Sequence, residues 1–203
     1  MTSITSIADL EQIYGAPSAA ATVKVSDRLT PEYQALLEAS VFLCLATVGP
    51  EGVDCSPRGD RNELVRVESE TCVLLPDRRG NNRIDSLRNV VRDPRLALLV
   101  LLPGSGTTLR INGTGSILAD PALLESFEVD GKAPRTVLKI HVQEAYFQCA
   151  RAIVRSGLWD PESRVCESEL PKPGQILQSM SEGEIDGQAY DQEWPQRARR
   201  TLW

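Results

Sequence analysis

The sequence contains a single histidine, His141, within residues 136–142, where apolar and polar side chains alternate. Serine-hydrolase triads and most zinc sites require histidine in a defined setting. One histidine in a predicted strand is more often a packed or surface residue. We therefore expect neither a catalytic histidine nor a metal site.

Cysteine is also sparse and irregularly spaced. No two of the five cysteines form a CxxC pair, which leaves a zinc ribbon or a redox motif unsupported. An odd number of cysteines without a signal peptide is typical of a reducing cytoplasm, so we expect a cytoplasmic protein. Three of them lie in apolar strand patterns and are expected in the core. The five are Cys44, Cys55, Cys72, Cys149 and Cys166.

Positive charge is not in excess, because 22 basic residues face 28 acidic ones and the net charge is −6. Nucleic acids and acidic membrane surfaces are bound by an excess of lysine and arginine. No apolar run approaches the ~18–20 residues of a membrane span. We expect neither a nucleic-acid nor a membrane partner. A local basic cluster in such a protein suits a small anionic ligand better.

Such a cluster lies in residues 77–83, Asp-Arg-Arg-Gly-Asn-Asn-Arg, between an apolar run and a short helical pattern. Asn82 is the predicted N-cap of that helix, which would place Arg83 in the first turn. A helix N-terminus attracts anions, and the planar groups of Arg78, Arg79 and Arg83 match a phosphate. The alternative is a solvated basic loop, since a basic turn is a weak motif.

Strands dominate the middle of the chain. About six of them, mostly joined by short turns, are predicted between residues 41 and 142, with Gly113 and Gly115 marking a bulge or a close backbone approach. Helices are predicted after Asp120-Pro121, over residues 122–127, and over residues 144–154. This pattern predicts a mainly β domain, residues 41–159, which is an antiparallel barrel or sandwich with flanking helices.

The two ends differ in character from this domain. Residues 1–40 form a predicted helical extension, with one helix capped by Ser6 and another opening at Thr30-Pro31, joined by a surface linker. Residues 160–203 are polar and rich in proline. We predict an extended tail with a basic helix at 196–201, which wraps either its own body or a partner.

The ordered features resemble the pyridoxamine 5′-phosphate oxidase-like flavoproteins. Residues 42–159 carry the resemblance, through LATVGPEGVDCSPRGD, LLPDRRGNNRIDSLRNVVRDPRLALLVLLPG, TLRINGTGSI and FQCARAIVRSGLW. Together they most resemble the subgroup of probable FMN-dependent enzymes of undefined substrate. The resemblance implies an antiparallel split β-barrel and a homodimer with two FMN sites at the subunit interface.

The resemblance also implies four groups of cofactor-binding residues. The group along the flavin and its ribityl chain is Ser56, Pro57 and Arg58. The group that holds the FMN phosphate is Asn81, Asn82 and Arg83. The group reaching the flavin from the second subunit is Leu109 and Arg110. The C-terminal group that closes the site is Arg155, Ser156 and Trp159.

The sequence departs from the vitamin-forming oxidases after the first arginine. Those members carry a lysine soon after it, whereas Arg58 is followed by Gly59-Asp60. Oxidation of pyridoxamine phosphate is therefore not expected. The absence of a GxGxxG fingerprint favours FMN over FAD. The resemblance implies an FMN-dependent oxidoreductase acting on an unknown small molecule, with NAD(P)H as a candidate electron donor.

Two other interpretations stay open. One is a non-catalytic flavin-binding, storage or sensor protein on the same barrel. The other, with weaker support, is a heme or deazaflavin binder. The sequence contains no pattern from which the substrate can be read.

Overall fold

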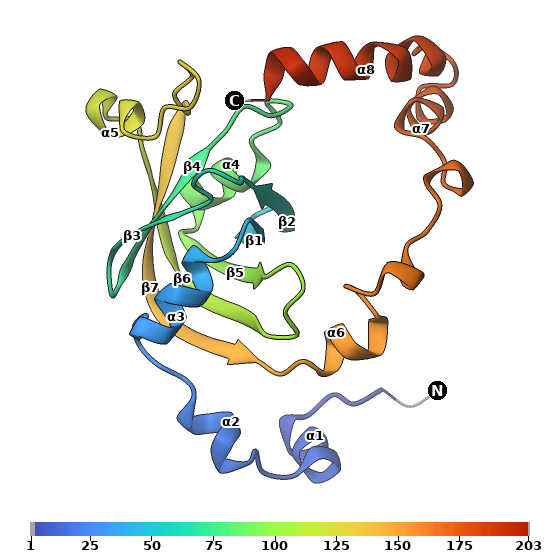
Figure 1. Cartoon of the computed structure of the whole chain (residues 1–203). Helices are drawn as coiled ribbons and strands as arrows, with labels where there is room; N and C mark the ends of the chain where they lie inside the picture. The colour runs from blue at the N-terminus through green and yellow to red at the C-terminus, as the bar shows by residue number, and fades with distance from the viewer. Residues whose placement is uncertain (1–2, 203) are drawn as a thin grey trace.

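The computed structural model describes residues 3–202, and its centre is one antiparallel sheet of seven strands in the order β2-β1-β5-β6-β7-β4-β3. The sheet curves into the predicted split barrel (Figure 1). Its strands are β1 (Phe42–Gly49), β2 (Gly52–Gly59), β3 (Arg66–Ser69), β4 (Cys72–Asp77), β5 (Arg95–Leu101), β6 (Thr108–Leu118) and β7 (Thr136–Gln148).

Alternation of side chains explains how the barrel is filled. Leu109 and Ile111 of β6 are fully buried, whereas Arg110 between them is only half-buried and lies on the opposite face. Across the strands, Leu98 pairs with Ile111 and with Leu45. Each such apolar side chain contributes about 1.5–3 kcal/mol when fully buried. Arg110 therefore points away from the core of the barrel.

The pairing of β6 with β7 contains the bulge that the glycines predict. The register shifts between Asn112 and Gly113. A Cβ atom on Gly113 would lie 2.1 Å from the carbonyl oxygen of His141, so no other residue fits without moving backbone.

The predicted helix over residues 144–154 is wrong. Strand β7 continues to Gln148, with Glu144 opposite Asn112 and Gln148 opposite Thr108, and helix α6 is confined to Arg151–Ser156. Ala145 is fully buried in the sheet. Pairing with the long β6 strand therefore outweighs the local helical propensity of this stretch.

Helices cover the edges of the barrel. Helix α3 (Pro31–Glu38) is capped by Thr30, as predicted, and buries Leu37 completely. Helix α4 (Asp85–Arg92) packs mainly against β1. Helix α5 (Pro121–Glu125) is capped by Asp120 and ends two residues before the predicted limit.

The N-terminal extension holds α1 (Ile7–Tyr14), which Ser6 caps as predicted and which buries no residue. The segment predicted as a linker contains one further short helix, α2 (Ala19–Val23). Among residues 3–202, no helix combines the length with the apolar composition that a membrane span needs.

The C-terminal segment is more helical than predicted. After the short 3-10 turns Pro161–Ser163 and Glu167–Glu169 it forms α7 (Pro173–Met180) and α8 (Gly187–Thr201). In Figure 1 it arches away from the barrel, and α8 returns to the side of the barrel where α5 lies. There, Lys132 Nζ lies 3.3 Å from the carbonyl oxygen of Leu202.

Two glycines allow helices α7 and α8 to pack closely against each other. A Cβ atom on Gly174 would lie 2.0 Å from the carbonyl oxygen of Gly187, so α7 and α8 approach each other closely. Asp186 caps α8 by accepting a hydrogen bond from Ala189 N. The helix therefore begins well before residue 196 and passes through Pro195.

Candidate functional site

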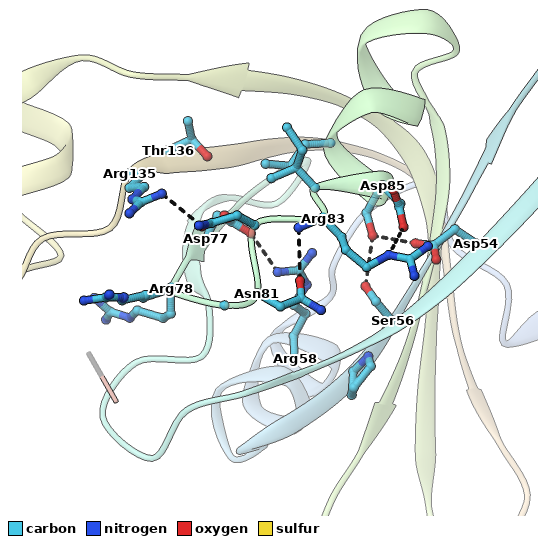
Figure 2. A pocket seen from close by; sticks show the side chains of 17 residues that line it. Asp54, Ser56, Arg58, Asp77, Arg78, Asn81, Arg83, Asp85, Arg135 and Thr136 are labelled. Atoms are coloured by element: carbon cyan, nitrogen blue, oxygen red, sulfur yellow. Dashed lines mark hydrogen bonds and ion pairs between the residues drawn. The ribbon is translucent and has the colours of Figure 1, made fainter. Parts of the chain in front are cut away.

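A cavity of about 660 Å³ lies between one edge strand and the start of helix α4. It is lined by Asp54, Ser56, Pro57 and Arg58 of β2, by residues 77–87, and by Arg135 and Thr136 at the start of β7. Figure 2 shows these side chains converging from the three segments. The size falls within the usual range for a small-molecule site.

The lining carries an excess of positive charge. Five arginines and three aspartates line the cavity, so positive charges outnumber negative ones by two. A phosphate monoester carries about 1.5–2 negative charges at neutral pH. The cavity therefore complements one phosphate group, although the protein as a whole has a net charge of −6.

Arg58 and Arg78 are each held in place by an ion pair with an aspartate. Arg58 Nη1 lies 2.7 Å from Asp77 Oδ1, and Arg78 Nε lies 2.9 Å from Asp60 Oδ2. Arg78 Nη1 also donates to the carbonyl oxygen of Phe127 at 2.6 Å. These contacts fix two guanidinium groups before any ligand binds.

Three buried polar atoms around the cavity lack a hydrogen-bond partner. They are Arg58 Nε, Arg78 Nη2 and Thr136 Oγ1, and within residues 3–202 the one further such atom is Arg197 Nη2 in α8. A buried polar group without a partner costs about 1–3 kcal/mol. Their concentration at one cavity indicates a ligand that supplies acceptors there.

The start of α4 differs from the prediction. Asn82 is not its N-cap, because Asn82 and Ile84 both adopt left-handed backbone geometry and the helix begins only at Asp85. Asn82 Oδ1 instead accepts a hydrogen bond from Arg135 at 3.0 Å. Ile84 occupies the cap position and offers no side-chain acceptor. The first N–H groups of α4 therefore have no side-chain cap, which suits an anion.

Arg83 precedes the helix instead of lying in its first turn. Its Nε lies 2.8 Å from Asp85 Oδ2, and its side chain is 76% exposed. Asp85 is the first residue of α4, where the positive end of the helix dipole stabilises its carboxylate. This ion pair explains how an arginine is tolerated at that end.

Hydrogen bonds among Asp54, Ser56 and Ser86 join β2 to α4 within the cavity lining. Ser86 Oγ donates to Asp54 Oδ2 at 2.6 Å and lies 3.0 Å from Ser56 Oγ. Ser86 is the second residue of α4 and is 3% exposed. Figure 2 shows Asp54 and Ser56 on the same side of β2, facing α4.

The structure brings together six of the eleven predicted cofactor-binding residues. Ser56, Pro57, Arg58, Asn81, Asn82 and Arg83 all line the cavity. The other five do not line it in the same chain. They are Leu109, Arg110, Arg155, Ser156 and Trp159.

Those five residues have partners elsewhere in the chain. Arg110 lies 5.1 Å from the ring centre of Tyr146, and Trp159 Nε1 donates to the carbonyl oxygen of Ser105 at 2.7 Å. Arg155 and Ser156 bond to carbonyl oxygens of their own helix, and Leu109 is fully buried in the core. Their role at a flavin stays a prediction.

The prediction missed several cavity residues. Asp54 lies two positions before Ser56 on the same strand, and this spacing was the signal that could have identified it. Asp77 belongs to the basic turn itself, and Ser86 follows it in the first turn of α4. The pair Arg135-Thr136 comes from a distant segment, and no local pattern links that pair to the basic turn.

The single histidine and the cysteines lie outside the cavity lining. His141 is exposed on β7. The expectation that three cysteines are core residues is wrong, because Cys44 and Cys72 are half-buried and the other three are exposed. Burial and a hydrogen bond to Glu68 raise the pKa of Cys72 to about 11.

The pKa of the exposed Cys149 thiol is shifted in the opposite direction. Its pKa is lowered by a backbone hydrogen bond from Arg151 and by the charges of Arg151 and Lys24. Among residues 3–202, no group of three or more histidine, cysteine, aspartate or glutamate side chains could hold a metal ion.

Comparison with known proteins places the barrel and this cavity in context. The family model described as pyridoxamine 5′-phosphate oxidase matches residues 29–149, well over half of the chain. The match runs from before α3 to the end of β7 and contains every residue that lines the cavity. A comparison with curated proteins found no match.

Several solved structures are similar at low sequence identity. HupZ of Group A Streptococcus is 16% identical, with 57% of this chain and 90% of that chain covered, at a TM-score of 0.47. An FMN-binding protein of Syntrophomonas wolfei is 15% identical, covering 56% and 86%, at 0.43. General Stress Protein 26 of Bacillus anthracis is 13% identical, covering 56% and 88%, also at 0.43.

Proposed function

This chain belongs to the pyridoxamine 5′-phosphate oxidase family, and we propose that it is an FMN-dependent oxidoreductase acting on a small molecule. The observation that carries the proposal is the cavity between β2 and α4. Its lining has two excess positive charges, three unpartnered buried polar atoms and an uncapped helix start. This combination fits the terminal phosphate of a mononucleotide cofactor.

The residues present divide the work of holding FMN. Arg58, Arg78 and Thr136 would bind phosphate oxygens with the polar atoms that now lack partners. The first N–H groups of α4 and the exposed Arg83 would complete the anion site. Ser56 and Pro57 would lie along the flavin and its ribityl chain.

FMN brings hydride transfer to the site, and the protein orients the ring and tunes its charge. Arg110 of a second subunit would supply positive charge that stabilises the anionic form of the reduced cofactor. No histidine is needed for this role, in agreement with His141 lying outside the cavity lining. The residues that line the cavity do not indicate a chemical class for the substrate.

We further propose that the protein is a homodimer with shared sites. An outward apolar face on β1 and β5 supports this, since Phe42 is 37% and Leu99 is 40% exposed. Arg110 points away from the core of its own barrel, where a second subunit's flavin would reach it. Arg155, Ser156 and Trp159 would close the site from the C-terminal side.

Mixed dimers test the shared site. An Arg58→Ala chain is combined with an Arg110→Ala chain, and each is expected to bind FMN weakly as a homodimer. A shared site predicts that one of the two heterodimer sites carries both defects and the other carries none. About half of the flavin per heterodimer would then bind with wild-type affinity. If no tight binding returns, both residues serve the same chain and the shared-site proposal is rejected.

The experiment for the function itself begins with the purified protein's visible spectrum. Any released cofactor is then identified by chromatography, and FMN is the expected species. Reduction by NAD(P)H followed by reoxidation with oxygen or another acceptor would support an oxidoreductase. Bound FMN that no donor reduces would indicate a non-catalytic flavin-binding or sensor protein instead. A heme or deazaflavin spectrum, FAD or no cofactor would contradict the FMN proposal.

A further inference from the structure

We propose that Asp54 and Ser86 are positioning residues that fix the hydroxyl of Ser56 as a pure hydrogen-bond acceptor in the cavity. Ser56 would thereby recognise an O–H or N–H donor on the ring or the ribityl chain of bound FMN. This inference rests on the proposed FMN site and extends it. It assigns a role to two cavity residues to which the proposed function gives none.

Donor and acceptor chemistry sets the direction of the hydrogen bonds among Asp54, Ser86 and Ser56. A carboxylate can only accept, so the 2.6 Å contact between Ser86 Oγ and Asp54 Oδ2 uses the one proton of the Ser86 hydroxyl. The 3.0 Å contact between Ser86 and Ser56 must then use the proton of Ser56. The lone pairs of Ser56 Oγ are what remains for a ligand.

The backbone holds the three side chains in register. Asp54 and Ser56 are two positions apart on β2, where they pair with Thr47 and Leu45 of β1. Ser86 comes from the first turn of α4 and is 3% exposed. Because Ser86 is shielded from water, its proton has no competing solvent acceptor.

An unconstrained serine hydroxyl rotates and serves as either donor or acceptor. A hydroxyl with fixed polarity discriminates between ligands, because a ligand without the matching donor leaves it unpaired. The competing explanation is that these bonds merely fasten α4 to β2. That explanation predicts a loss of stability without any change in ligand recognition.

The test is FMN titration of the cofactor-free protein, followed by flavin fluorescence, with thermal unfolding measured in parallel. Ser56→Ala and Ser86→Ala should each weaken FMN binding about three- to tenfold, the loss of roughly one hydrogen bond. The double variant should bind no more weakly than Ser56→Ala alone. Ser86→Thr, which keeps the hydroxyl, should restore most of the affinity.

Thr47→Val is the matched control. Thr47 is buried and accepts a hydrogen bond from Asn89 Nδ2 of α4 at 3.1 Å. This bond also joins α4 to the sheet, but it does not involve Ser86 or Ser56. This variant should lower the unfolding temperature and leave the affinity for FMN unchanged. If Ser86→Ala does not fold, Ser86→Cys removes the strong hydroxyl donor at nearly constant size and should weaken binding likewise.

Two analogues identify the donor on the ligand. One is FMN methylated at ring N3, and the other carries the phosphate on a chain without hydroxyls. Ser56→Ala should lose its effect with whichever analogue lacks the group that Ser56 recognises. An effect of Ser56→Ala that survives with both analogues would overturn the assignment.

The outcomes separate this inference from the proposed function. A wild-type protein that does not bind FMN refutes the proposed function, and this inference with it. A wild-type protein that binds FMN while Ser86→Ala changes only the unfolding temperature overturns this inference alone. Additive losses of affinity in the double variant would do the same, because Ser86 would then act independently of Ser56.

Discussion

Arg58→Lys separates the positive charge at the cavity from the shape of the group that carries it. Lysine keeps a cation that can pair with Asp77, but it lacks the Nε donor and the planar group of arginine. In the structure Arg58 Nη1 lies 2.7 Å from Asp77 Oδ1, and Arg58 Nε is buried without a partner. The substitution therefore removes the donor that the proposal assigns to the phosphate.

The size of the expected loss of FMN affinity follows from the burial of Arg58. The side chain of Arg58 is 23% exposed, so solvent screens its hydrogen bonds only weakly. A hydrogen bond to a charged group contributes about 1.5–3 kcal/mol, which corresponds to a roughly ten- to hundredfold loss of FMN affinity. The free energy of unfolding without cofactor should stay within about 1 kcal/mol of wild type, because the loss of an unpaired buried donor offsets a weaker ion pair with Asp77.

The assay is fluorescence titration of cofactor-free protein with FMN, together with urea unfolding. Arg95→Lys is the matched control, since Arg95 is also paired with an aspartate, Asp93, but does not line the cavity. It should bind FMN like the wild type. Wild-type affinity in Arg58→Lys would refute the assignment of Arg58 Nε to the phosphate.

Three further variants or treatments have defined outcomes. Arg83→Ala should weaken FMN binding only about two- to fivefold, because Arg83 is 76% exposed; titration showing no loss would support the solvated-loop interpretation. Gly113→Ala should destabilise the protein by on the order of 1–3 kcal/mol, since its Cβ would lie 2.1 Å from a carbonyl oxygen; an unchanged urea midpoint would contradict the close packing. Iodoacetamide at pH 8 should modify Cys149, whose pKa is lowered, long before Cys72, whose pKa is raised to about 11; mass spectrometry showing the reverse order would contradict these environments.

Local signals in the sequence predicted local structure well. Thr30 and Asp120 each cap a helix in the predicted place, because capping depends on residues three positions apart. The bulge at Gly113 was also predictable, since a glycine inside a strand pattern marks close backbone approach. The family resemblance identified the split barrel and six of the residues that line the cavity.

Features that depend on distant partners were not predictable in this way. Residues 144–148 were predicted as helix, and only pairing with β6 makes them a strand. Asn82 carries a typical capping side chain, yet it bonds to Arg135, which lies far along the chain. The chain from Asp54 through Ser86 to Ser56 likewise depends on the contact between β2 and α4, which no single segment encodes.

The central claim is that the cavity between β2 and α4 holds the phosphate of FMN, and a paired titration tests it most directly. Cofactor-free wild-type protein is titrated with FMN and with riboflavin, which differ only in that phosphate. Two or more charge-assisted hydrogen bonds predict that riboflavin binds at least about a hundredfold more weakly. Equal affinity for the two flavins would contradict the assignment of this cavity to the phosphate.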